Sequence, residues 1–98
     1  RTMWIGNFRV KSIRINLNNK LINGLQIIEI DEIGPLYEKG IRAGDIIIEI
    51  NEGESSWGNL TKSLKFAAIG DDIKMKLLTS SKEFKFVKII SSEIEKVN

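Results

Sequence analysis

The chain has 98 residues, of which 42% are hydrophobic and 29% charged, a composition typical of one ordinary globular domain. Its formal net charge is only +2, which argues against the basic stripe of a nucleic-acid binder. No apolar run approaches the roughly 20 residues that cross a membrane, and no signal peptide is evident. The first residue is Arg1, which suggests a segment of a longer chain with other domains as neighbours.

Cysteine and histidine are both absent. The sequence therefore offers no disulfide, no thiolate metal site and no imidazole base for acyl transfer. Asp71 and Asp72 form a carboxylate pair, but they follow Gly70 in a predicted turn, where Asp is favoured for its local hydrogen bonds. We expect no catalytic residue, no metal and no cofactor.

The first predicted strand is "FRVKSIRINL", residues 8–17, in which apolar and polar residues alternate. The alternation changes phase at Ser12, which predicts a bulge or a break at that position. The polar stretch "NLNNK", residues 16–20, predicts a loop.

Further strands are predicted at residues 24–30, "GLQIIEI", and 46–50, "IIIEI", because both are rich in β-branched residues. Residues 73–79 and 83–90 flank the short turn "SSK" and predict a β-hairpin.

Two helices are expected between these strands. "PLYEKG", residues 35–40, has proline at a natural first helical position and glycine at a natural end. The second helix begins after an N-cap at Ser55 or Ser56 and ends at Gly70, with apolar residues at helical spacing on one face. We therefore expect a mainly β (α+β) fold, a small partly open barrel or sandwich of five to six strands capped by two helices. A single domain is expected over residues 1–90, followed by a tail or linker over 91–98.

The segment "IGPLYEKGIRAGDIIIEIN", residues 33–51, resembles the signature segment of PDZ domains. The positions that match the family pattern are Pro35, Gly40, Ile41, Gly44, Asp45, Ile47, Ile50 and Asn51. The resemblance extends over about residues 4–90. The residue types suit such a turn, since Gly40 and Gly44 can reverse the chain and Asp45 can accept hydrogen bonds from backbone amides.

Several residues depart from the family pattern. Gly34 stands where Ser is usual, Leu36 and Lys39 where Ala is usual, and Glu52 where Gly is usual, with Gly53 one position later. The length of the loop after Asn51 is therefore left open.

The resemblance implies that an extended peptide binds as an added antiparallel strand between a sheet edge and the longer helix. The implied carboxylate loop is "WIGN", Trp4, Ile5, Gly6 and Asn7, with a polar Asn7 where the family usually has an apolar residue. The implied edge strand, residues 8–11, contributes Phe8, Arg9 and Val10, and the implied helix wall contains Trp57, Leu60, Thr61 and Leu64. Two alternatives remain, namely that Trp4 and Ile5 form a plain edge strand and that Leu60 and Leu64 are core residues.

The resemblance is nearest to PDZ modules of bacterial envelope proteases, with the HtrA-type serine proteases first. Site-2 metalloproteases, C-terminal processing proteases and aspartyl proteases share the same core pattern. The resemblance implies a regulatory module that binds C-termini or unfolded segments in the cell envelope. The alternatives are a scaffolding module whose groove is packed against a neighbour or filled by the tail, and an enzyme, which the lack of His and Cys disfavours. The sequon at Asn59 lies in a predicted helix and is treated as chance.

Overall fold

The computed structural model describes residues 3–68 and 70–90 of the chain. Its strands are β1 (Phe8–Leu17), β2 (Lys20–Ile30), β3 (Ile46–Ile50), β4 (Gly53–Glu54), β5 (Asp72–Leu78) and β6 (Phe84–Ile90), and its helices are α1 (Pro35–Glu38) and α2 (Trp57–Lys65). The expected mainly β fold with two short helices is therefore confirmed. Neither helix in this part of the chain has the length and apolar character needed to cross a membrane.

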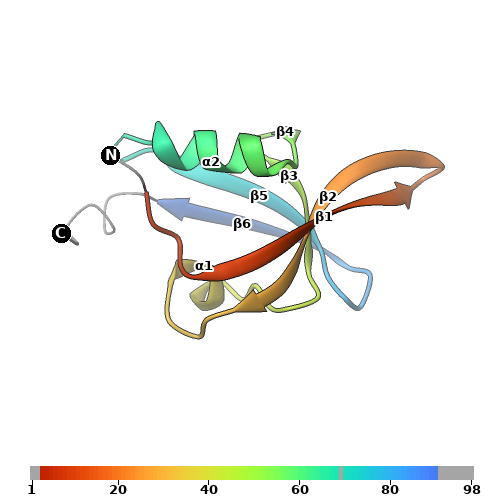
Figure 1. Ribbon diagram of the computed structural model, residues 1–98, viewed down its shortest axis with the longest axis horizontal. Coiled ribbons are helices and arrows are strands. Elements are labelled where there is room, and N and C mark those ends of the chain that lie inside the picture. Colours follow the sequence, from red (N-terminus) through yellow and green to blue (C-terminus); the bar gives the residue numbers. More distant parts are fainter. Residues whose placement is uncertain (1–2, 69, 91–98) are drawn as a thin grey trace.

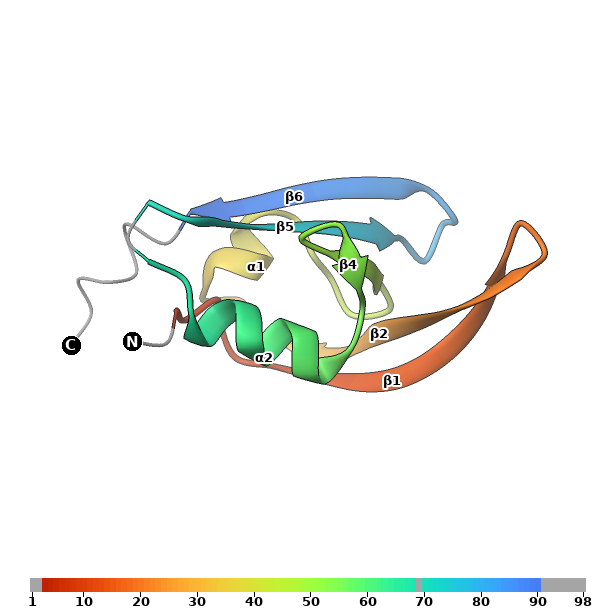
Figure 2. The same cartoon turned by 90° about the horizontal axis from the view of Figure 1, so that it is seen from above.

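The strands form one antiparallel sheet in the order β1-β2-β3-β5-β6, with β4 paired to β3. The sheet curls, so that β1 and β2 face β5 and β6 across the core (Figure 2). The helices α1 and α2 lie on opposite sides of this curled sheet (Figure 1). Side chains from both halves of the sheet and from both helices fill the space between them, among them Leu25, Ile27, Leu36, Ile41, Ile47, Ile50, Leu60, Ile73 and Leu77.

The first hairpin differs from the prediction in two respects. Its strands pair from Phe8 with Ile30 to Leu17 with Lys20, and the pairing is regular from Val10 onward, so the predicted loop over residues 16–20 is wrong. Only Asn18 and Asn19 form the turn, with φ of 54° and 63°. Two left-handed residues match the twist of a two-residue hairpin turn, and Asn tolerates that conformation better than most residues.

The predicted bulge at Ser12 is also wrong. The register shifts between Arg9 and Val10, which pair with Glu29 and Ile27, so the extra residue is Ile28 on β2. Beyond this point β1 alternates regularly, which places Ser12 on the same face as Val10. The change of phase in the sequence therefore marks a change in which face of the strand is apolar.

Helix α2 begins as predicted, because the Ser56 side chain accepts a hydrogen bond from the Asn59 amide at 3.0 Å. It ends at Lys65, about one turn before Gly70. Continuation would require Leu64 O to accept from the Ala68 amide. Instead Met3 N donates to Leu64 O at 2.9 Å, and Ala68 N donates to Asp71 Oδ2 at 2.8 Å. A tertiary contact from Met3 and a local turn contact from Asp71 thus replace the next intrahelical bond.

Candidate functional site

The free edge of β1 is the main feature of the candidate site. β1 is the first strand of the sheet order, and within the described residues β2 is its one partner. The outward-facing N–H and C=O groups of β1 consequently have no protein partner in this part of the chain, and α2 runs alongside them (Figure 2). Within residues 3–68 and 70–90, the expectation of an unpaired sheet edge beside the longer helix is confirmed. The suggestion that the tail fills this space lies outside the described residues.

A hollow of about 460 Å³ lies where β1 faces the start of α2. It is lined by Phe8, Arg9, Val10, Ser12, Leu25 and Trp57. The rings of Phe8 and Trp57 meet edge to face, with centroids 6.4 Å apart, which is a favourable geometry for an aromatic pair. Trp57 remains 53% exposed, so this apolar surface is accessible. We refer to this hollow and the adjoining edge of β1 as the groove.

The loop at residues 4–7 is held by its carbonyl groups. Ile5 O accepts from the Leu36 amide at 3.0 Å, and Asn7 O accepts from the Asp31 amide at 2.9 Å. In contrast, the amides of Ile5, Gly6 and Asn7 have no hydrogen-bond acceptor among the described residues. Three successive amides of this loop therefore remain available to an acceptor from outside this part of the chain.

Glycine at position 34 allows this loop to pack closely. A Cβ atom added to Gly34 would lie 2.8 Å from the Cα atom of Gly6 and 3.5 Å from the Trp4 ring. Real Cβ contacts with backbone are essentially never that short, so even the smallest side chain would displace the loop. The departure from the usual Ser therefore sets the position of the free amides.

The four loop residues have different surroundings. Ile5 is buried in the core, whereas Trp4 is exposed and its Nε1 donates a long hydrogen bond of 3.5 Å to Asn7 Oδ1. Gly6 has a φ of 124°, a conformation that residues with a side chain rarely adopt. The structure thus brings Gly6 and Asn7 to the surface of the loop and Ile5 beneath it.

The predicted helix wall is divided between core and groove. Leu60 is fully buried and belongs to the core, and Leu64 is half-buried against the same cluster. Thr61 is half-buried, and its Oγ1 donates within the helix to Trp57 O at 2.9 Å. Among these four residues, Trp57 is the one that lines the hollow described above.

On the other wall, the sequence analysis missed Ser12 and Leu25, because the expected edge strand ended at Lys11, just before the bulge or break expected at Ser12. The even spacing of Ser12 with Phe8 and Val10 was the available signal. Arg9 is exposed and its Nε donates to Glu29 Oε1 at 3.0 Å. An exposed pair of this kind contributes little to stability.

The signature turn lies between β2 and β3 and has a structural role. Gly40 and Gly44 adopt φ of 93° and 97°, as expected for glycines that reverse the chain. Asp45 is buried, and its Oδ2 accepts from the Arg42 amide at 3.0 Å. The Gly44 amide donates to Ile27 O at 2.8 Å, which fastens the turn to β2. Pro35 begins α1, as the sequence predicts.

Asn51 joins the two halves of the sheet. Its amide donates to Lys74 O at 2.7 Å, and its Oδ1 accepts from the Lys74 amide at 2.9 Å. Asn51 and Glu52 have φ of 50° and 64° and form a two-residue turn before Gly53 begins β4. The turn length that the sequence left open is therefore two residues, and Glu52 takes the left-handed position where Gly is usual.

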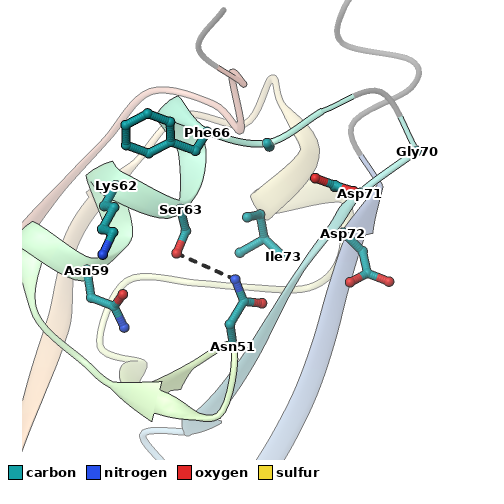
Figure 3. A pocket seen from close by; sticks show the side chains of 10 residues that line it. Asn51, Asn59, Lys62, Ser63, Phe66, Gly70, Asp71, Asp72 and Ile73 are labelled. Atoms are coloured by element: carbon teal, nitrogen blue, oxygen red, sulfur yellow. Dashed lines mark hydrogen bonds between the residues drawn. The ribbon is translucent and has the colours of Figure 1, made fainter.

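A second and larger hollow, of about 570 Å³, lies on the other flank of α2 (Figure 3). Its polar groups are largely engaged within the chain. Asn51 Nδ2 donates to Ser63 Oγ at 3.5 Å, and Asn59 Nδ2 donates to Glu54 O at 2.7 Å. These contacts hold α2 against the sheet, so we assign this hollow a structural role.

The carboxylates of Asp71 and Asp72 border the second hollow and point in different directions (Figure 3). Asp71 accepts from the Ala68 amide, as expected for Asp in a turn. Across residues 3–68 and 70–90, no three His, Cys, Asp or Glu side chains gather closely enough to hold a metal ion.

Comparison with known proteins supports the family resemblance. Curated proteins contain no significant match to the chain. The family model of the PDZ domain matches residues 9–87, which include the free edge of β1, the signature turn and α2. PDZ domains bind peptide C-termini or protein segments and are generally non-catalytic. Since the match covers well over half of the sequence, the chain belongs to the PDZ domain family.

Proposed function

We propose that this domain binds a C-terminus or an extended segment of another polypeptide by adding it as an antiparallel strand to β1. The observation that carries the proposal is the unpaired edge of β1 beside the exposed Trp57 of α2. Backbone groups of β1 supply hydrogen bonds to the guest, and the groove supplies contacts for its alternate side chains.

The loop at residues 4–7 gives this proposal a direction. Free amides at Gly6 and Asn7 favour the guest carboxylate at the start of β1, so the guest runs toward its own N-terminus along β1. The half-buried Leu64 and Phe8 favour an apolar final residue. Exposed Asn7 adds a polar group at the rim of this position.

A peptide titration tests the proposal. Peptides with an apolar C-terminal residue are expected to bind with roughly micromolar affinity, because the interface is small and the guest strand must be ordered. The free acid is expected to bind at least about tenfold more tightly than the amide, since a charged acceptor forms stronger hydrogen bonds with amides.

Backbone NMR shifts locate the interaction during the same titration. Shifts are expected at residues 5–11 and along α2, while Lys88 on β6 serves as a distant reference. A library that shifts no resonance in either region contradicts the proposal and favours the alternative of a scaffolding module with an occluded groove. If the free-acid and amide forms of a peptide bind equally, the loop amides of Gly6 and Asn7 do not recognise the guest carboxylate, and strand addition to β1 still stands.

We further propose that the domain regulates a bacterial envelope protease, with HtrA-type enzymes first. The support is the sequence resemblance of the signature segment, the loop "WIGN" and the α2 segment. Sequencing the gene around this segment is expected to find a serine protease domain, or else a membrane-embedded metalloprotease or an aspartyl protease. An open reading frame without any protease domain contradicts this part of the proposal.

A further inference from the structure

The hairpin of β1 and β2 has an unusual charge distribution. From Phe8 to Ile28 the sequence contains Arg9, Lys11, Arg14 and Lys20 but no Asp or Glu. Arg9 pairs with Glu29. Lys11, Arg14 and Lys20 are exposed, and no acidic side chain lies within ion-pair distance of them among the described residues. A local excess of positive charge therefore stands on a chain whose net charge is only +2.

This basic segment projects from the body of the domain. β2 pairs with β3 only at Leu25 and Gln26, so residues 13–24 form a two-stranded arm. The arm extends beyond the N-terminal end of α2 (Figures 1 and 2). The ten residues of β1 span roughly 30 Å at ~3.4 Å per residue, whereas the hollow beside Trp57 is lined by β1 only as far as Ser12. The free edge thus continues past the groove along the arm.

We propose that the arm recognises acidic residues upstream in the peptide that occupies the groove. This inference rests on the proposed strand addition and extends it from the last few guest residues to the preceding ones. A guest that continues along β1 passes Arg14 on one face of the strand and Lys11 on the other, where Lys20 lies opposite Leu17 across the hairpin. A guest carboxylate on either face therefore meets a positive charge that has no acidic partner among the described residues. Continuity with the groove and charge complementarity both favour an acidic polypeptide over other anions.

The arm also carries apolar side chains on one face. Ile13, Ile15 and Leu17 lie at alternate positions of β1 and are each half-buried, while Arg14 lies on the other face. A guest strand with alternating acidic and apolar residues can therefore place its carboxylates beside Arg14 and its apolar side chains beside the isoleucines. A lipid surface or a nucleic acid cannot form the ladder of backbone hydrogen bonds that an added strand forms along the edge of β1.

Three twelve-residue peptides with identical last four residues test the inference. Their upstream residues alternate Ile with Glu, with Gln or with Lys. The Glu peptide is expected to bind roughly tenfold more tightly than the Gln peptide at low salt, because a few exposed ion pairs each contribute a small factor. The gain is expected to shrink to about twofold near 0.5 M salt, where exposed charges are screened.

Charge variants of the protein locate the effect. The double variant Arg14→Gln and Lys20→Gln is expected to lose most of the Glu-over-Gln preference. It is expected to keep its affinity for a four-residue peptide that consists of the shared last four residues alone. The matched control is Lys74→Gln and Lys88→Gln, which makes the same charge change on exposed positions of β5 and β6 and is expected to keep the preference.

The outcomes separate this inference from the proposed function. If the four-residue and Gln peptides bind but Glu adds no affinity, or if the double variant keeps the preference, the inference is wrong and strand addition stands. If no peptide binds, both are wrong. If a twelve-nucleotide single strand displaces the Glu peptide at equal concentration, the arm is a general polyanion site and the inference fails.

Discussion

Replacing Leu60 by Ala is expected to lower the free energy of unfolding by about 2–5 kcal/mol. Leu60 is 0% exposed and packs in the core where α2 meets the sheet, and removal of its isobutyl group leaves a cavity there. Because small domains are stable by only about 5–15 kcal/mol, this single change removes a large share of the total. Urea denaturation followed by tryptophan fluorescence measures it.

Two companion variants separate the core from the groove on the same helix. Leu60→Met conserves volume and is expected to cost less than ~1.5 kcal/mol. Thr61→Ala is expected to leave the free energy of unfolding within about 0.5 kcal/mol of the parent, since the Thr61 hydroxyl bonds only to carbonyls of its own helix. Because Thr61 belongs to the predicted helix wall of the groove, the same variant is expected to weaken peptide binding a few-fold. A Leu60→Ala domain as stable as the parent would show that α2 is not anchored by this residue.

The strands of the body were predictable because burial on one face imposes a period of two. β5 and β6 illustrate this, since Ile73, Met75 and Leu77 are buried while the lysines between them face outward. The signature turn was predictable for a local reason. Its glycines and Asp45 lie within a few residues of each other, so their spacing in the sequence is enough to predict the shape of the turn.

The hairpin arm was harder to predict because its apolar residues are not in the core. Ile13 and Ile15 continue the alternation on the face opposite to that of Val10, which from sequence alone is indistinguishable from a bulge. The bulge itself lies on β2 at Ile28, where the apolar alternation changes phase between Ile27 and Ile28. Such a phase change in one strand does not by itself say which strand of the pair carries the extra residue. Strand pairing, rather than either strand alone, determines these positions.

Two features of the candidate site depend on contacts between distant segments. The end of α2 is fixed by Met3 and Asp71, which replace its next internal hydrogen bond, and no pattern within the helix encodes that. The loop at residues 4–7 owes its orientation to Leu36 and Asp31. The family resemblance predicted that Gly6 and Asn7 belong to this loop. That their amides have no acceptor among the described residues depends on these long-range contacts and was not predictable from the sequence.

Replacing Gly34 by Ala is expected to reduce the affinity for free-acid peptides by about tenfold or more. The added Cβ would lie 2.8 Å from Gly6 Cα, and the φ of 137° at position 34 is itself unfavourable for Ala. Relief of this clash requires the loop to move away, which turns its free amides from the groove. We also expect a loss of about 1–3 kcal/mol in the free energy of unfolding, as for other strained backbone positions.

Gly58→Ala is the matched control for this substitution. Gly58 lies in the first turn of α2, and a Cβ added there meets nothing within 4 Å, so Ala is expected to stabilise the helix by about 0.5–1 kcal/mol and to leave affinity unchanged. Calorimetric titration of both variants with acid and amide peptides isolates the loop. If Gly34→Ala lowers acid and amide binding equally, the loop supports the groove only by packing. If it binds the free acid like the parent, the close approach of Gly34 to Gly6 does not govern recognition of the guest carboxylate.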